Sequence, residues 1–367
     1  MSSPQPQTVR VRETVLKAFC TAVLQRLGVA ADEAALVTEV LVEADLRGVE
    51  SHGVLRLPQY VERITAGGAN PKPNIRPVRE TRTTAVLDGD NGLGHLVGVR
   101  AMELAMAKAA EGDCAFVAVR NSNHYGAAAY FAEMAARRDM IGLSFTISGL
   151  LLFPPWGGTE AMIGNNPLAV AFPTDRGFPI VLDMACTVAR GKILAASKKG
   201  VSIPADWATG PDGLPTTDPT EALKGLLLPV GGPKGYALAV TVGLLSTMLS
   251  GAAFGSEIGQ VHWQTDTAAN VGHLFGVIPI SSFEDIARYK QRIGKAIEDI
   301  QNVKKAPGVE RIFLPGEREY LLMQERRQQG IPLSLGVFKD LRQMGDRFGL
   351  ELATIGSSCG RSKPVMA

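Results

Sequence analysis

The sequence alternates short apolar segments with longer segments of helical periodicity, and this alternation limits the possible folds more than any other feature. The segments TTAVLDGD, AFVAVRN and IGLSFTI, at residues 83–90, 115–121 and 141–147, have the length and composition of strands. Between them, residues 97–112 and 126–139 carry apolar side chains three and four positions apart, as amphipathic helices do. The alternation predicts an α/β sheet with crossover helices. Similar composition predicts further strands at residues 168–173, 178–184 and 273–280.

Both ends of the chain are expected to be helical. Residues 11–28 and 31–48 have helical periodicity and each ends in glycine, and the helical pattern returns from residue 282 onward. Residues 68–78, GANPKPNIRPV, combine glycine, asparagine and three prolines, which is typical of a linker. We therefore expect a helical domain built from residues 1–75 and 281–367, and an α/β domain of residues 76–280 that binds dinucleotide and substrate.

One uncharged run, residues 235–256, reaches the length of a membrane span. It is rich in Gly, Ala, Ser and Thr rather than Leu and Ile, and it lies between polar segments in the middle of the chain. A helix that is apolar all round can equally be the buried centre of a large domain. The buried helix is the favoured interpretation, and no membrane partner is expected.

The charge balance excludes a strongly basic surface. Lys plus Arg total 38 and Asp plus Glu total 36, so nucleic acid is not an expected partner and a small molecule is. The four cysteines, at positions 20, 114, 186 and 359, form no C-x-x-C pair, and the five histidines form no metal-binding motif. We expect no metal. With no export signal at the N-terminus, we expect a reducing, cytoplasmic location.

The segment VESHGVLRLPQY, residues 49–60, contains the first candidate site. His52, Arg56 and Tyr60 are spaced by four residues, so they would share one face if the segment is helical. Ser51 lies directly before the histidine. A solvated helix face with an incidental histidine explains this spacing equally well.

The segment RNSNHYGAAAYF, residues 120–131, contains the second candidate site. His124 is expected at the turn from a strand into a helix, where α/β proteins bind ligands beside helix N-termini. The small residues 126–129 would let a flat ring or a phosphate approach the backbone. The alternative is a helix cap with an incidental histidine.

Glycine-rich stretches elsewhere do not match known nucleotide loops. Gly92, Gly94 and Gly98 have the spacing G-x-G-x-x-x-G, which departs from the G-x-G-x-x-G dinucleotide fingerprint. The sequence also lacks a phosphate loop of the G-x-x-x-x-G-K-[ST] type and a G-x-S-x-G nucleophile elbow. Neither a Rossmann domain nor a serine hydrolase is predicted.

Several stretches together resemble one family. They are DLRGVESHGVLRL, NSNHYGA, PPWGG, GNNPLAVAFP, VLDMA with ARGKI, PVGGPKGYALA and LPGERE, in this order between residues 45 and 319. The resemblance extends from about residue 10 to about residue 350. The set is similar to the malate/L-lactate dehydrogenase family that is unrelated to the usual lactate and malate dehydrogenases, and that includes sulfolactate dehydrogenase, ureidoglycolate dehydrogenase and reductases of cyclic imino acids. The resemblance implies a mixed-sheet α/β/α core of the sulfolactate-dehydrogenase-like, non-Rossmann type, with a helical region built from both chain ends.

The resemblance also implies an NAD- or NADP-dependent oxidoreductase, usually a homodimer, and it suggests site residues by motif. Ser51, His52 and Arg56 fall on the family's S-H-G-x-x-R site, and His124 falls on the histidine that accepts a proton in some members. We add Tyr60 and Asn165 as residues that line the substrate. The expected cofactor residues are Tyr125, Gly126, Ala127, Ala128, Ala129, Asp183, Met184, Ala185, Lys234, Gly235, Arg311, Pro315, Gly316 and Glu317.

The expected reaction is hydride transfer between nicotinamide and a 2-hydroxy or 2-oxo carboxylic acid. An arginine binds such a carboxylate with two parallel hydrogen bonds, and an imidazole exchanges the hydroxyl proton near neutral pH. Two alternatives stay open: a reductase of cyclic or N-alkyl imino acids, and a catalytically silent relative that only binds ligand. Cyclic-imine reductases of the family have an acidic residue at the position of Lys192, and many members have Asn at the position of Ile147. The difference at Lys192 counts against an imine substrate. The difference at Ile147, like Asn165 where members have Thr, alters the wall of the expected pocket.

Overall fold

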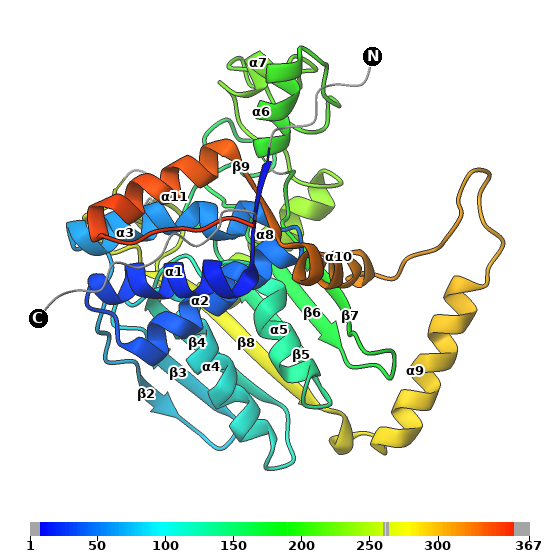
Figure 1. Cartoon of the computed structure of the whole chain (residues 1–367). Coiled ribbons are helices and arrows are strands. Elements are labelled where there is room, and N and C mark those ends of the chain that lie inside the picture. Colours follow the sequence, from blue (N-terminus) through cyan, green and yellow to red (C-terminus); the bar gives the residue numbers. More distant parts are fainter. Residues whose placement is uncertain (1–7, 189, 260, 262–263, 356–367) are drawn as a thin grey trace, which may run out of the picture. The chain divides into compact units, whose positions relative to one another are not determined.

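The computed structural model describes residues 8–188, 190–259, 261 and 264–355 and divides the chain into two compact units (Figure 1). The smaller unit contains the described residues up to Glu62 together with those from Glu319 onward, and the larger unit contains Arg63–Arg318. The division into domains at residues 75 and 281 that we expected from the sequence stays a prediction.

The smaller unit is helical and joins the two ends of the chain. Strand β1 (Thr8–Val11) pairs antiparallel with β9 (Ile331–Ser334), so that Val11 lies opposite Ile331. Helix α1 packs against α2 and α11, with Leu16, Val23 and Leu24 fully buried. The helices that begin, end or lie in this unit are α1 (Glu13–Arg26), α2 (Ala31–Leu46), α3 (Leu57–Ala66), α10 (Glu317–Gln329) and α11 (Leu335–Phe348).

The larger unit is built on a seven-stranded mixed sheet in the order β2-β3-β4-β8-β5-β6-β7. Strands β3 and β4 are parallel and are joined by the crossover helix α4, whereas every other neighbouring pair is antiparallel. This arrangement confirms the predicted α/β class with a mixed, non-Rossmann sheet. The strands are β2 (Arg76–Glu80), β3 (Thr84–Asp88), β4 (Ala115–Ser122), β5 (Met140–Thr146), β6 (Leu168–Phe172), β7 (Ile180–Met184) and β8 (Val271–Pro279).

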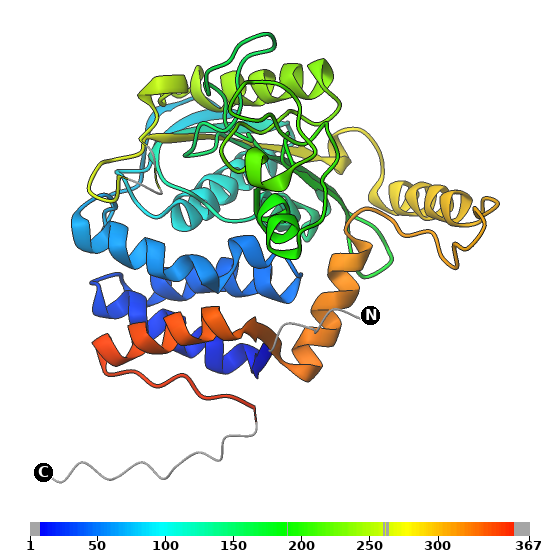
Figure 2. The same ribbon diagram turned by 90° about the horizontal axis from the view of Figure 1, so that it is seen from above.

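Helices cover both faces of this sheet. Figure 2 shows α4 (Gly94–Ala109) and α5 (Ala128–Ala136) on one face and the yellow-green helix α8 (Pro233–Thr247) on the other. Residues of the central strand β8 contact helices on both faces, because successive side chains of a strand point to opposite faces of the sheet. A side chain at Gly272 would meet the backbone of Ser246 in α8, whereas Phe275 packs against Phe131 in α5.

Two expectations from the sequence need correction or refinement. The proposed linker 68–78 runs into β2, which begins at Arg76 and pairs with β3. All five residues of β2 are exposed and the strand lies at the edge of the sheet, where a proline is tolerated. The uncharged run at 235–256 is helical only as far as Thr247, and within the described part of the chain no helix is long and apolar enough to cross a membrane.

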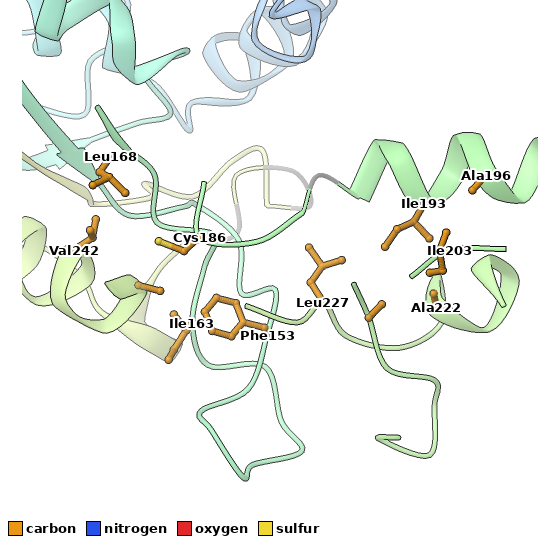
Figure 3. Packing of buried hydrophobic residues seen from close by; sticks show 12 residues of the cluster. Phe153, Ile163, Leu168, Cys186, Ile193, Ala196, Ile203, Ala222, Leu227 and Val242 are labelled. Atoms are coloured by element: carbon orange, nitrogen blue, oxygen red, sulfur yellow. The ribbon is translucent and has the colours of Figure 1, made fainter. Parts of the chain in front are cut away.

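A separate apolar cluster lies beside β6 and α8 and was not predicted from the sequence (Figure 3). Phe153, Ile163 and Cys186 form one part of it near Val242 of α8. Leu227 connects this part to a second part on the short helices α6 (Arg190–Lys199) and α7 (Pro219–Ala222).

The larger unit also contains the long helix α9 (Ile286–Gln301).

The contact between α5 and β5 allows a direct test of the packing. A Cβ atom at Gly142 would lie 2.1 Å from the backbone oxygen of Ala132, so Gly142→Ala must push the helix from the sheet. We expect it to lower the free energy of unfolding by about 2–3 kcal/mol, as overpacked substitutions do. The control is Gly191→Ala in α6, where nothing lies within 4 Å of the new methyl group and the change should be neutral or stabilising by less than about 1 kcal/mol. Equal denaturation midpoints for the two variants would contradict this packing.

Candidate functional site

The segment 49–60 does not form the single helix that would align its polar side chains. It forms two short 3₁₀ turns, Glu50–His52 and Val54–Arg56, before α3 begins at Leu57. Gly53 separates the turns in an extended conformation, with φ −89° and ψ −154°. The condition on which His52, Arg56 and Tyr60 would share one helix face, a continuous helix over this segment, is therefore not met, because the extended Gly53 interrupts it.

The two turns nevertheless hold Ser51, His52 and Arg56 in one hydrogen-bonded group. Ser51 Oγ and His52 Nδ1 share a hydrogen bond of 2.8 Å, and Arg56 Nε donates to the backbone oxygen of Ser51 at 2.8 Å. Burial, together with the charge of Arg56, lowers the pKa of His52 to about 4. His52 is thus neutral at physiological pH. Tyr60 is 2% exposed, and burial raises the pKa of its hydroxyl group.

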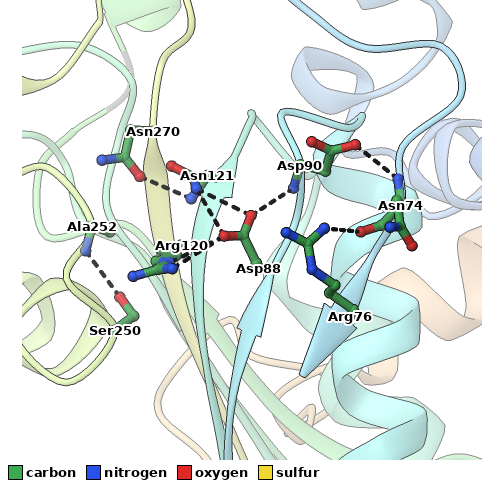
Figure 4. Close-up of polar contacts among 9 residues, drawn as sticks. All are labelled: Asn74, Arg76, Asp88, Asp90, Arg120, Asn121, Ser250, Ala252 and Asn270. Carbon is green, nitrogen blue, oxygen red and sulfur yellow. Dashed lines mark hydrogen bonds and ion pairs between the residues drawn. The ribbon is translucent and has the colours of Figure 1, made fainter. Parts of the chain in front are cut away.

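The turn that carries His124 follows β4 and begins with an irregular backbone. The register of β4 against β8 shifts between Val119 and Ser122, and Asn121 has a φ of 51°, in the left-handed region. Partly buried polar groups hold this conformation (Figure 4). Asn121 Nδ2 donates to both carboxylate oxygens of Asp88 at 3.1 Å, and the Asn121 backbone N–H donates to Asn270 Oδ1 at 2.8 Å.

A buried histidine that sequence reasoning did not select holds the next part of the turn. His273, in β8, hydrogen-bonds to Ser122 Oγ at 2.8 Å and to Thr146 Oγ1 at 2.6 Å, so it joins the ends of β4 and β5. The ring of Tyr125 stacks on it with a centroid distance of 4.7 Å and an interplanar angle of 4°. Burial lowers the pKa of His273 to about 3, so the ring is neutral.

Hydrogen bonds also hold the side chain of Asn123. Its Oδ1 atom accepts from Arg63 Nη2 at 2.9 Å, and its Nδ2 atom donates to the backbone oxygens of Asn91 and Gly92 at 3.0 and 2.9 Å. The segment that presents the half-buried His124 is therefore fixed before any ligand binds. The ring centroid of His124 lies 6.4 Å from that of the buried His95.

Tyr125 and the small residues after it have different environments. Tyr125 is 2% exposed and its hydroxyl group hydrogen-bonds with Ser144 at 3.1 Å, so it belongs to the core beneath the turn. Gly126 has a φ of 85°, which favours glycine. Ala127, Ala128 and Ala129 are buried at the start of α5.

The motifs predicted for the cofactor all border β7 and the residues that follow it. Asp183 Oδ2 accepts from the backbone N–H of Ala129 at 3.2 Å, at the N-terminus of α5. Val181, two residues earlier, donates its N–H to the oxygen of Pro315 at 3.0 Å. Ala129 lies 54 residues before Asp183, and Pro315 lies more than a hundred residues after Val181, and the structure brings both to one edge strand of the sheet.

Strand β7 ends at Met184, and after Ala185 the chain contacts two further motifs. Cys186 donates its N–H to the oxygen of Asn165 at 2.7 Å, and its own oxygen accepts from Val230 at 2.8 Å. A side chain at Gly235 would lie 2.0 Å from the oxygen of Val230, so the glycine permits this close packing. Lys234, beside it, is exposed on the first turn of α8.

The loop 311–317 is shaped by a buried carboxylate. Glu317 is 2% exposed, and it accepts from the N–H of Leu314 at 2.9 Å and forms an ion pair with Arg311. The guanidinium groups of Arg311 and Arg318 lie 5.0 and 4.7 Å from the ring centroid of Phe313. Glu317 thus supports the loop from inside, while Arg311 and Arg318 are exposed.

These residues fit a dinucleotide in their chemistry. The exposed carboxylate of Asp183 can accept hydrogen bonds from hydroxyl groups, and the cationic groups at Arg311, Arg318 and Lys234 can bind phosphate. Among the described residues, no cluster of three or more His, Cys, Asp or Glu side chains is arranged to hold a metal ion.

The buried His273 predicts a specific acid sensitivity. Its pKa is about 3 in the folded chain and about 6.5 in the unfolded chain, so the unfolded state binds an additional proton between these values. The contribution of His273 to the free energy of unfolding should therefore fall by about 1.4 kcal/mol per pH unit as the pH drops below 6.5. His273→Gln keeps a donor and an acceptor but does not titrate, so its unfolding free energy should decline less steeply. Parallel pH dependences in urea denaturation of the two proteins would contradict the neutral, buried imidazole.

Comparison with known proteins decides the family. The model of the malate/L-lactate dehydrogenase family matches residues 11–342. The chain belongs to the malate/L-lactate dehydrogenase family. The resemblance deduced from the motifs is confirmed, and membership places the chain among the oxidoreductases.

Three proteins illustrate the range of this family. A malate dehydrogenase from Pyrococcus horikoshii is 42% identical over 352 residues, which cover 94% of this chain and 96% of that protein. The solved structure of sulfolactate dehydrogenase from Methanocaldococcus jannaschii has a TM-score of 0.88 and 38% identity, and the match covers 94% of this chain and 98% of that one. The structure of delta1-piperideine-2-carboxylate reductase from Pseudomonas syringae has a TM-score of 0.78 and 27% identity, with 91% and 99% covered. The first two proteins are named for hydroxy acids and the third for a cyclic imine.

Proposed function

We propose that the chain is an NAD(P)-dependent dehydrogenase that transfers a hydride between C2 of a 2-hydroxy or 2-oxo carboxylic acid and nicotinamide. The observation that carries the proposal is the hydrogen-bonded group of Ser51, His52 and Arg56, in which a guanidinium lies beside a neutral imidazole and a hydroxyl group. Malate and sulfolactate, for which two of the relatives are named, are both 2-hydroxy carboxylates.

Arg56 would bind the carboxylate of the substrate. Its Nε atom is already bonded to the oxygen of Ser51, so the plane of the guanidinium is set before binding. A planar guanidinium binds a carboxylate with directional, charge-assisted hydrogen bonds, which also orient the adjoining C2 atom.

His124 would accept the proton from the substrate hydroxyl, and His52 would orient the substrate. The pKa of His52 is lowered to about 4, which is far from the value near 7 that makes a general base most effective at neutral pH. Ser51 and neutral His52 can instead hydrogen-bond with the C2 oxygen. The low pKa of His52 supports the assignment of the acid/base role to His124.

The cofactor would be held along β7. Asp183 offers a carboxylate to ribose or carboxamide groups, and Arg311 and Lys234 offer positive charge to phosphates. The bound nicotinamide supplies the hydride acceptor or donor. We also propose that the protein is cytoplasmic and forms a homodimer. Light scattering coupled to gel filtration would test the homodimer.

The reduction of an imino acid is the second candidate function, because one structural relative is named a piperideine-carboxylate reductase. The position that carries an acid in such reductases is Lys192, which is exposed on α6. A positive side chain cannot deliver the same proton relay as a carboxylic acid, so we rank this function below hydroxy acid oxidation.

The experiment is a substrate panel. Purified protein is incubated with NADH or NADPH and each of several 2-oxo acids, with and without methylamine, and with a cyclic imine, while the absorbance of the reduced nicotinamide is followed. We expect turnover with a 2-oxo acid alone. Turnover that requires methylamine or the cyclic imine would favour the imine function, and measurable cofactor binding without turnover would favour a silent ligand-binding relative.

A further inference from the structure

A buried carboxyl group lies behind the Ser51–Arg56 segment and has no part in the proposed chemistry. Asp45, in the last turn of α2, is 2% exposed. Its Oδ2 atom accepts from the backbone N–H of Val54 at 2.8 Å. Burying a carboxyl group is unfavourable unless it forms such contacts, so the position demands an explanation.

The carboxyl group lies directly against Gly53. A Cβ atom at residue 53 would lie 2.1 Å from Asp45 Oδ1 and 2.4 Å from Oδ2, closer than any side chain tolerates. The φ of Gly53 is negative, so the glycine is needed here for close approach and not for a left-handed conformation. Asp45 and Gly53 therefore fit one another as a pair.

A second contact holds the same region from the C-terminal part of the unit. Arg326, in α10, is 8% exposed, and its Nη1 atom donates to the backbone oxygen of Asp45. Its Nη2 atom forms an ion pair of 2.7 Å with Glu50, the first residue of the turn that carries Ser51 and His52. The two 3₁₀ turns are thus fixed on both sides of Gly53.

We propose that Asp45 is a positioning residue whose carboxyl group sets the break at Gly53, and thereby the relative placement of His52 and Arg56. This inference rests on the proposed function, because it assigns these two side chains to the substrate. The first turn carries His52 and the second carries Arg56, so the hydrogen bond to Val54 fixes the joint between imidazole and guanidinium.

The protonation of Asp45 agrees with this role. Burial and the neighbouring Glu50 raise the pKa of Asp45 to about 7, whereas the hydrogen bond from Val54 and the charge of Arg326 act in the opposite direction. Near pH 7 the carboxyl group is therefore partly uncharged, and its uncharged form can still accept the hydrogen bond from Val54. An asparagine, which is neutral and has the same shape, should therefore replace it well.

The test compares Asp45→Ala with Asp45→Asn in the full-length chain. A small displacement of a substrate-binding group can lower activity by about a hundredfold. We expect Asp45→Ala to lower kcat/KM for the best 2-oxo acid by about 10–100-fold, mainly by raising KM, and to leave the Kd of NADH or NADPH unchanged. Asp45→Asn should stay within about threefold of the wild type, because Asn keeps the acceptor for Val54.

The pairing with Gly53 gives an independent comparison. Gly53→Ala forces a methyl group against the carboxyl group and should damage kcat/KM to a similar degree. In the double variant the new methyl group occupies space that Asp45→Ala vacates, so the double variant should retain about tenfold more activity than the product of the single effects predicts. If Asp45→Ala does not fold, the comparison of Gly53→Ala with Asp45→Asn carries the test.

A readout without turnover separates this inference from the proposed function. The imidazole resonances of His52, assigned with the variant His52→Asn, should shift in Asp45→Ala and return in Asp45→Asn. If these shifts occur in a protein that turns over no substrate, the positioning role stands and the proposed function fails. Unchanged His52 resonances and KM in Asp45→Ala, equal damage by Ala and Asn, or strictly multiplicative effects with Gly53→Ala would overturn the inference.

Discussion

Replacing His124 by asparagine is expected to lower kcat by about 10²–10⁴-fold, the usual loss when a general acid–base is removed. The substitution should also abolish the limb of the pH–rate profile that reports the deprotonation of this residue. Folding should be little affected, because contacts of Asn121, Ser122 and Asn123 hold the backbone before His124 and the buried Tyr125 follows it. None of these contacts is made by the imidazole of His124. The measurement is kcat and kcat/KM as functions of pH for the wild type and the variant.

The matched variant is His52→Asn. Because its low pKa makes His52 a poor base near neutral pH, its loss should raise KM more than it lowers kcat. The reverse pattern, a flat pH profile for the His52 variant and a normal profile for the His124 variant, would exchange the two roles.

Arg56→Ala is expected to weaken the binding of the transition state by about 2–5 kcal/mol, measured as the loss in kcat/KM for a carboxylate substrate. The variant removes the charged donor that pairs with the carboxylate. Arg56→Lys keeps the charge without the planar fork, so it should recover only part of this loss. The Kd of the cofactor should hardly change in either variant, because the residues proposed to bind it lie along β7, in the larger unit.

A different distribution of effects would contradict the assignment. If Arg56→Ala abolished the binding of NADH or NADPH and left the KM of the substrate unchanged, Arg56 would belong to the cofactor site. Equal activity of the Ala and Lys variants would show that neither the charge nor the planar fork of residue 56 contributes.

Much of the sheet was predictable from local sequence, because a strand and an amphipathic helix differ in the period of their apolar residues. The segment 115–121 falls within β4, the segment 141–147 overlaps β5 as far as Thr146, and α1 and α2 lie within the expected helices. The edge strand β2 was missed. Its composition is that of a turn, since an exposed edge strand needs no apolar face and tolerates proline.

The order of the strands and the buried polar contacts were not predictable in this way. Strand β8 is inserted between β4 and β5, and only this insertion places His273 between Ser122 and Thr146. The contact of Asp45 with Val54 depends likewise on how the chain turns after α2. Motif resemblance suggested the candidate residues, whereas their supports became visible only in three dimensions.

Hydride transfer from C2 is tested by following the hydrogen atom on that carbon. The 2-hydroxy acid that corresponds to the best 2-oxo acid of the substrate panel is prepared with deuterium at C2. It is oxidised with NAD or NADP, and the reduced cofactor is examined by mass spectrometry. We expect the deuterium to be transferred to the nicotinamide ring. We also expect a primary isotope effect on kcat/KM, unless release of a product is slower than hydride transfer. Formation of reduced cofactor without deuterium, or no reduced cofactor from any 2-hydroxy acid tested, would contradict hydride transfer from C2 as the function of this protein.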